Sequence, residues 1–135
     1  MTFPVSSTSV QTAACARFVR VMQRSNAEPL IEHGGVYNCR TVAGSSTYSQ
    51  HAWGNAIDLF AKQSKDLLAI ADNAVLQATK RTKANRGRKL PVHRIIVQDK
   101  TWVKGAGWFG YGGVYHTHVH VDFEPNRYGV PPCAT

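Results

Sequence analysis

The sequence predicts an α+β domain in which a small antiparallel sheet is flanked by two or three helices. Two segments repeat apolar residues with the period of a helix, and several short segments have the apolar character of strands. The chain has 135 residues, which is enough for one hydrophobic core but not for two. Apolar residues make up 43% and charged residues 18%, a balance typical of a folded globular protein. We therefore expect one domain over residues 1–135.

The expected helices lie in the first and the middle third of the chain. The first covers about residues 10–24, where every third or fourth residue is apolar. The second begins near Ser64 and ends before a basic segment at residues 80–89. The expected strands are short and apolar, and they cover residues 30–32, 56–60, 94–98 and 115–123. Residues 104–113 are rich in glycine and aromatic side chains, which predicts a loop.

The charge balance is strongly basic. Lysine and arginine number 16 against 8 acidic residues, which gives a formal net charge of +8. Such a surplus favours an anionic partner: nucleic acid, anionic lipid or a bacterial wall polymer. Residues 80–89 carry six positive charges, which fits either a solvated loop or a binding patch for an anionic polymer. No nucleic-acid reading motif is recognisable there, so we expect no nucleic-acid partner.

The sequence disfavours both membrane insertion and secretion by a signal peptide. The longest apolar runs, such as residues 67–71, are far shorter than a segment that crosses a bilayer. The first nine residues lack a basic start followed by an apolar stretch, so we expect no signal peptide.

The cysteines give a weak signal. Cys15, Cys39 and Cys133 show no CxxC spacing, which argues against a structural zinc site built from thiolates. Their odd number leaves two alternatives open: one bridge between Cys39 and Cys133, or three buried free thiols.

Three of the six histidines lie in one expected strand, in the sequence His116-Thr-His118-Val-His120-Val-Asp122. Alternate side chains of a strand share a face, so the histidines and Asp122 point one way and the residues between them point the other. A buried row of histidines is costly unless it binds something. Because neutral imidazole is a common zinc ligand, the pattern indicates a metal site more than an exposed strand edge.

Further candidate ligands lie upstream, in the segment Ser49-Gln-His51-Ala-Trp-Gly54-Asn-Ala-Ile-Asp58. On one continuous helix His51 and Asp58 would lie about 10 Å apart along the axis, whereas ligands of one zinc ion lie about 3–4 Å apart. The chain between them must therefore turn, and Gly54-Asn55 is where it can. Asp58 lies in an apolar strand, where a carboxylate is costly unless a cation or an internal hydrogen bond compensates it.

Together these segments resemble the zinc D-Ala-D-Ala carboxypeptidase and endopeptidase family, whose superfamily includes lysostaphin-like enzymes and the hedgehog domain. Within it, residues 35–40 (Gly-Val-Tyr-Asn-Cys-Arg) and 49–58 look most similar to the extensin-like C-terminal domain. That domain also pairs a Tyr-x-Cys-Arg segment with Ser-x-His-Ala-x-Gly-Asn-Ala-Ile-Asp, and it ends in a His-x-His-x-Asp strand. The resemblance covers about residues 35–60 and 116–123, and it implies a fold of the hedgehog and DD-peptidase type.

The resemblance implies a zinc ion held by His51, Asp58 and His120. Zinc in such a site lowers the pKa of a bound water to near 7 and polarises a scissile carbonyl. His116 and His118 repeat the His-x-His spacing, so His118 remains an alternative third ligand.

The expected general base is His118, beside the open zinc position. Many enzymes of the family carry a glutamate three residues before the last ligand, where this chain has Thr117. His116 and Asp122 therefore remain alternatives for the base, and Asp122 could also orient a ligand imidazole. Arg40, in the matched Cys-Arg segment, is the expected cation for the oxyanion, with a plain surface charge as the other interpretation.

Four residues are candidates for contacts with the substrate. Ser49 and Gln50 are expected to hydrogen-bond the metal ligands or the substrate. Trp108 and Tyr111 lie on the glycine-rich segment near the histidine strand, where they could line a cleft for a glycopeptide or cap the sheet.

The resemblance thus implies a zinc metallopeptidase that cuts peptide stems or cross-bridges of bacterial peptidoglycan, as a carboxypeptidase or an endopeptidase. The small size, the basic charge and the expected lack of a signal peptide suit a phage lysis enzyme, released from the host cytoplasm through a holin or carried on the virion. We expect a monomer, with anionic wall polymers as further partners. Two alternatives stay open: a non-catalytic wall-binding module on the same scaffold, and a basic nucleic-acid-binding protein.

Overall fold

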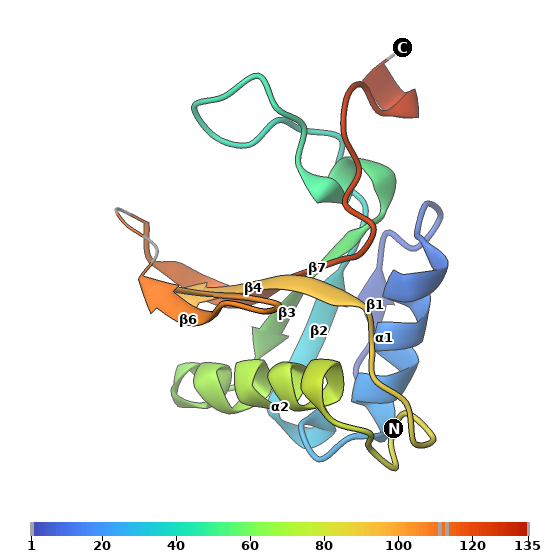
Figure 1. The fold of residues 1–135 in the computed structure, drawn as a ribbon, viewed down its shortest axis with the longest axis vertical. Coiled ribbons are helices and arrows are strands. Elements are labelled where there is room, and N and C mark those ends of the chain that lie inside the picture. The colour runs from blue at the N-terminus through green and yellow to red at the C-terminus, as the bar shows by residue number, and fades with distance from the viewer. Residues whose placement is uncertain (1, 111, 113, 135) are drawn as a thin grey trace.

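A computed structural model of the chain describes residues 2–110, 112 and 114–134. Its centre is a seven-stranded sheet with the strand order β1-β2-β3-β7-β4-β5-β6 (Figure 1). The strands are β1 (Val5–Ser6), β2 (Ile31–Gly35), β3 (Ala56–Ala61), β4 (Val92–Gln98), β5 (Lys100–Val103), β6 (Gly107–Gly110) and β7 (His116–Phe123). β1 and β2 run parallel, and the other neighbouring pairs are antiparallel. The expected α+β class is confirmed, although the sheet is larger than expected and mixed.

Both expected helices are present, as α1 (Ala13–Arg24) and α2 (Leu67–Thr79). They share one core with β7, in which the rings of Phe18 and Phe123 lie 5.3 Å apart. α1 begins later than expected because the side chain of Thr12 caps it by accepting a backbone N–H of the first turn. Short 3-10 helices occur at η1 (Glu28–Leu30), η2 (Gln50–Trp53), η3 (Ser64–Asp66) and η4 (Pro132–Ala134). Across the described residues, no helix is long and apolar enough to span a bilayer.

The two faces of the sheet differ in chemistry. Val119, Val121 and Phe123 of β7 are completely buried in the core that the helices share. Alternation along the strand directs the histidines of β7 to the opposite face. The segment between β2 and β3 and the C-terminal segment lie beyond that face, across the sheet from α2 (Figure 1). The polar face is therefore bordered by loops and short 3-10 helices instead of α-helices.

Residues 104–113 do not form the single loop expected from the sequence. β5 and β6 make an antiparallel hairpin whose register pairs Trp102 with Trp108. Gly105 and Gly107 adopt positive φ angles at its turn, a conformation that other residues rarely adopt. β6 is mostly exposed at the sheet edge, so its residues lack the apolar alternation that identifies a strand in a sequence.

One disulfide joins Cys39 to Cys133, across 94 residues of sequence. It links the segment that follows β2 to the C-terminal segment, and Cys15 is buried and free. Of the two arrangements left open by the sequence, the structure contains the bridge.

The cysteines should differ sharply in reactivity. Burial raises the pKa of the Cys15 thiol to about 12, and a protonated, buried thiol is a poor nucleophile. We expect the folded, unreduced protein to take up no iodoacetamide at about pH 8, well below that pKa. Unfolding without a reductant should expose one reactive thiol per chain and unfolding with a reductant should expose three, as counted by intact-protein mass spectrometry. Three thiols without a reductant would contradict the bridge.

Candidate metal centre

The centre of the sheet places Asp58 directly opposite His120. β3 and β7 are antiparallel neighbours, and their register pairs these two residues. The adjacent residues Leu59 and Val119 are completely buried in the core. Alternation therefore directs the side chains of Asp58 and His120 to the polar face, side by side.

His51 reaches the same point from η2, a 3-10 turn that precedes β3. Ser49 caps this turn, since its hydroxyl accepts the backbone N–H of His51 at 3.3 Å. Gly54 ends the turn in the left-handed conformation, with a φ of 65°, and the chain then enters β3. The turn expected at Gly54-Asn55 is confirmed, and it brings His51 back to Asp58.

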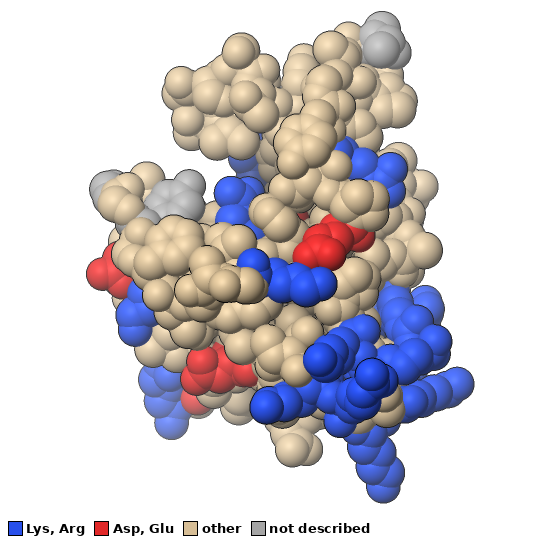
Figure 2. Space-filling view, viewed as in Figure 1, with Lys and Arg blue, Asp and Glu red and all other residues tan. Residues whose placement is uncertain are grey.

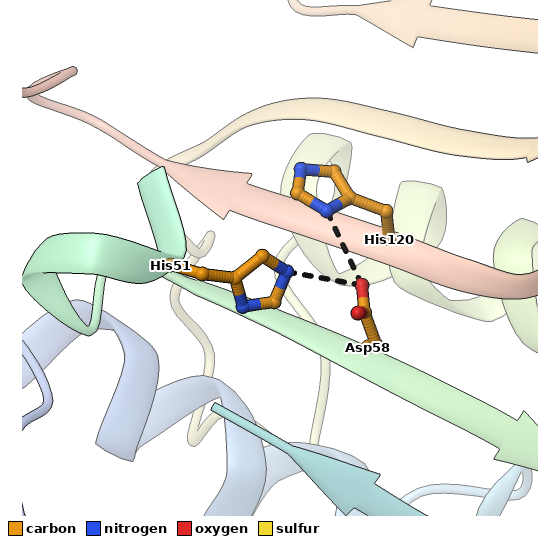
Figure 3. Close-up of side chains that lie close together, drawn as sticks. All are labelled: His51, Asp58 and His120. Carbon is orange, nitrogen blue, oxygen red and sulfur yellow. Dashed lines mark hydrogen bonds and ion pairs between the residues drawn. The ribbon is translucent and has the colours of Figure 1, made fainter. Parts of the chain in front are cut away.

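His51, Asp58 and His120 point toward one another from η2, β3 and β7 (Figure 3). His51 Nε2 lies 3.1 Å from Asp58 Oδ1, and His120 Nδ1 lies 3.3 Å from the same oxygen. One ligand atom from each residue lies within 4.8 Å of the others. The structure thus brings together all three expected metal ligands from two distant parts of the sequence.

Hydrogen bonds on the far side of each ring orient the two imidazoles. His51 Nδ1 lies 2.6 Å from the carbonyl oxygen of Val36, which can only accept, so this nitrogen carries the proton. His120 Nε2 donates in the same way to Asp122 Oδ2 at 2.8 Å. The remaining ring nitrogens, when neutral, therefore direct lone pairs toward the Asp58 carboxylate. Such a set of acceptors needs a proton or a cation among them.

The electrostatics of the cluster agree with this geometry. Burial alone would raise the pKa of Asp58, but hydrogen bonds with His120 and His51 outweigh burial and hold that pKa well below its usual range. Burial would lower the pKa of His120, but Asp122 and Asp58 raise it to about 9. The cluster therefore attracts positive charge, which a metal ion could supply in place of protons.

The donor spacing also fits a metal ion. Around a tetrahedral ion with bonds of about 2.0–2.1 Å, neighbouring ligand atoms lie about 3.3 Å apart. The separations of 3.1 and 3.3 Å from Asp58 Oδ1 are close to that value. Two of the donor separations therefore suit a metal ion, and all three donor atoms lie within 4.8 Å of one another.

Asp122 fixes the orientation of His120 and is itself completely buried. Its Oδ1 lies 3.0 Å from His93 Nδ1, and its Oδ2 lies 3.0 Å from the guanidinium of Arg94. A register shift in β4 between Val92 and Arg94 lets two consecutive residues reach one carboxylate. Burial would raise the pKa of Asp122, but His120, His93 and Arg94 hold it below its usual range.

Replacing Asp122 with asparagine should weaken the binding of added zinc by about 10- to 100-fold, the usual effect of losing the partner of a ligand imidazole. An amide in place of the carboxylate removes the charge that holds His120 and leaves Arg94 without its ion pair. Competition with a chromophoric zinc chelator measures the affinity. Asp99→Asn removes an exposed carboxylate elsewhere and serves as the control. Equal affinity in both variants would contradict an orienting role for Asp122.

An open cleft of about 420 Å³ adjoins the three-donor cluster through His120, which lines it. Six residues that the sequence singled out line it: Arg40, Ser49, Gln50, His116, His118 and His120. Its lining also includes Arg94 and Arg127, which sequence reasoning missed because nothing in their local pattern differs from ordinary surface arginines. Among the described residues that line this cleft are three arginines but no aspartate or glutamate. The cleft is therefore suited to a molecule that carries negative charge.

His118 lies beside the donors and lines the cleft. Its side chain is 27% exposed, and its Nε2 lies 3.5 Å from Asp58 Oδ1. Burial lowers the pKa of His118, and the Asp58 carboxylate acts in the opposite direction. His120 is more buried and completes the three-residue cluster, whereas His118 is open to a molecule in the cleft.

The side chain of Gln50 is held by the chain itself. Its Nε2 donates to the Arg127 carbonyl at 2.8 Å, and its Oε1 accepts the Arg127 backbone N–H at 2.9 Å. Oε1 also accepts from Asn55 Nδ2 at 2.9 Å. Both ends of the amide thus attach the C-terminal segment to the turn that carries His51. Gln50 thus lies in the wall of the cleft, and its expected contact with the metal ligands or the substrate stays a prediction.

The structure does not bring Trp108 to this cleft. Trp108 lies on β6 and lines a separate hollow of about 550 Å³ with Leu68, Asp72 and Phe109. The hairpin that was missed in the sequence is the reason, because it carries Trp108 to the far edge of the sheet. Tyr111, the other aromatic candidate, lies outside the described residues.

The contacts that define the site come from this chain alone. Two ligands are register partners on neighbouring strands, and the third is placed by a capped turn.

Comparison with protein-family models, with curated proteins and with solved structures found no match to the chain.

Proposed function

We propose that the protein is a zinc-dependent peptidase that hydrolyses a peptide bond in the stem or cross-bridge of bacterial peptidoglycan. The observation that carries the proposal is the convergence of His51, Asp58 and His120 on one point beside an open cleft. Two imidazoles and one carboxylate form a donor set typical of catalytic zinc, with one position left for water or substrate. Zinc bound there would polarise the scissile carbonyl and acidify a water molecule.

The residues of the chain have separate tasks in this proposal. His118 accepts a proton in the cleft, because its Nε2 is beside the donors and its ring is partly exposed. Arg40 lines the same cleft and offers a guanidinium to the oxyanion or to a substrate carboxylate. Asp122 keeps the His120 ring oriented, and Ser49 holds the turn that presents His51.

Peptidoglycan as substrate is supported by the family resemblance of the motifs and by the charge of the cleft. Stem peptides carry free carboxylates, which Arg40 and Arg127 of the cleft could attract. The disulfide supports action in oxidising surroundings outside the cytoplasm. These features agree with a phage lysis enzyme that reaches the wall after release by a holin or on a virion.

Digestion of purified peptidoglycan of several chemotypes, followed by mass spectrometry of the products, tests the proposal. New free amines with fragment masses of cut stems or cross-bridges are the expected result, and a chelator should abolish them until zinc is restored. New reducing sugar ends would overturn the proposal in favour of a glycosidase. Retention on the wall without any cleavage would indicate the non-catalytic binding module.

His118 and its neighbour His116 form a matched pair for the proposed proton transfer. Both line the cleft, and their rings lie 5.9 Å apart. His118→Ala should keep zinc and stop cleavage, whereas His116→Ala should keep both. Normal turnover in the His118 variant would remove it from the mechanism.

A further inference from the structure

A basic surface lies on the helix side of the sheet, away from the metal centre. Five arginines from α1 and from the loop after α2 surround a hollow of about 210 Å³. We call them the arginine surface: Arg17, Arg20, Arg24, Arg86 and Arg88. Figure 2 shows a dense group of basic side chains in this region, where α1 and the loop at residues 80–89 meet in Figure 1.

The loop is fixed to α1, so the arginines are not on a freely moving segment. Arg17 Nε donates to Asn85 Oδ1 at 3.0 Å, and Arg24 donates through two nitrogens to the Ala84 carbonyl at 2.9 and 2.7 Å. Asn85 is 1% exposed, and its Nδ2 donates to the Arg88 carbonyl at 2.9 Å. The basic side chains of the loop are exposed, as a solvated loop requires, but bonds to α1 hold it in place instead of repulsion holding it open.

The charges of the arginine surface are not neutralised by acidic side chains. The ion pairs found among the described residues include none with these five arginines. Burial lowers the pKa of Arg17, and the charges of Arg88, Arg20, Arg24 and Arg86 lower it further. Like charges held this close repel one another, and a bound anion would relieve that repulsion.

The side chains of this surface favour phosphate groups. A guanidinium presents paired N–H donors that match the oxygens of a phosphate, and five of them are gathered here. The large exposed apolar and aromatic side chains of the described chain lie outside residues 17–24 and 80–89. The surface therefore lacks the rings on which nucleic-acid bases stack and the apolar groups that enter a lipid surface.

We propose that the arginine surface binds a phosphodiester-linked polymer of the bacterial wall and holds the protein next to its substrate. The choice of polymer rests on the proposed function. Because the surface and the cleft lie on opposite sides of the sheet, one molecule could bind the polymer and a stem peptide at the same time.

Binding to poly(glycerol phosphate) at about 50 mM salt tests the proposal. The triple variant Arg20→Gln/Arg86→Gln/Arg88→Gln removes three exposed guanidinium groups and spares the two that fix the loop. It should bind about 10-fold or more weakly and show a smaller salt dependence, since fewer phosphates are neutralised.

A matched control removes three exposed lysines elsewhere, as Lys62→Gln/Lys65→Gln/Lys100→Gln. Lys62 and Lys65 precede α2, so its 13 residues place them about 20 Å from the loop that follows it. The control should keep its affinity within about threefold. An equal loss in both triple variants would show that net charge alone drives binding and would overturn the proposal, as would no binding by the wild type.

Two further arms separate the outcomes. Duplex DNA that binds as tightly as the polymer, with the same loss in the arginine variant, would overturn the choice of a wall polymer and favour nucleic acid. Soluble stem peptides and cross-linked stem dimers should be cut equally well by the wild type and the arginine variant. If neither protein cuts either substrate while polymer binding behaves as expected, the peptidase proposal fails and the assignment of the surface stands.

Discussion

Asp58→Asn is expected to abolish stoichiometric zinc and to lower peptide hydrolysis by about 1,000-fold or more, since the metal contributes several kcal/mol to the transition state. Asp58 Oδ1 is the atom that both ligand imidazoles face, at 3.1 and 3.3 Å. An amide there removes the negative charge and can turn a donor toward the two nitrogens. Metal analysis should give about one zinc per chain for the wild type and far less for the variant.

The control for this variant is Asp72→Asn, which makes the same chemical change on the exposed side of α2. It should keep both the zinc and the turnover of the wild type. Full zinc content and full turnover in Asp58→Asn would contradict the metal centre, and thermal unfolding of each variant checks that the fold is intact.

Gly54→Ala is expected to destabilise the protein by about 3 kcal/mol or more. Gly54 has a φ of 65°, and a Cβ built on it would lie 2.1 Å from the backbone oxygen of Val10. That contact is with backbone, so relief requires the turn to move. Because this turn carries His51, the affinity for zinc should fall as well. Urea unfolding and a zinc titration measure the two effects.

Gly44→Ala separates the cost of the left-handed backbone conformation from the cost of a steric clash. Gly44 has a φ of 75°, but nothing lies within 4 Å of a Cβ built there. The free energy of unfolding of this variant should fall by about 1 kcal/mol because of the left-handed conformation alone. Its zinc affinity should not change. Similar losses of stability in both variants would show that the close approach to Val10 does not matter.

The sequence singled out the residues of the candidate metal centre, although the choice of His120 over His118 came from the family resemblance. The period of two in β7 separates histidines from core residues, and a carboxylate in an apolar strand marked Asp58. Distance arithmetic required a turn before Asp58, and Gly54 was the residue able to make it. These inferences depend on local patterns, which is why they could be made without the fold.

The contacts that depend on strand pairing could not be predicted in the same way. The register shift in β4 that brings His93 and Arg94 to Asp122 leaves no mark in their sequence. The hairpin of β5 and β6 was missed because an exposed edge strand needs no apolar alternation. Without the hairpin, the position of Trp108 at the edge of the sheet could not be predicted. Likewise, attachment of the basic loop to α1 depends on side-chain bonds to Asn85 and Ala84.

The pairing of Asp58 with His120 across β3 and β7 would couple the binding of the proposed zinc ion to the folding equilibrium. An unfolded chain holds these residues 62 positions apart and has no preformed site, so a zinc ion would bind the native state in preference. Free zinc at about 100 times its dissociation constant would then add about 2.7 kcal/mol to the free energy of unfolding. The melting temperature should therefore rise with zinc concentration. The ion would then stabilise the native fold as well as take part in the reaction.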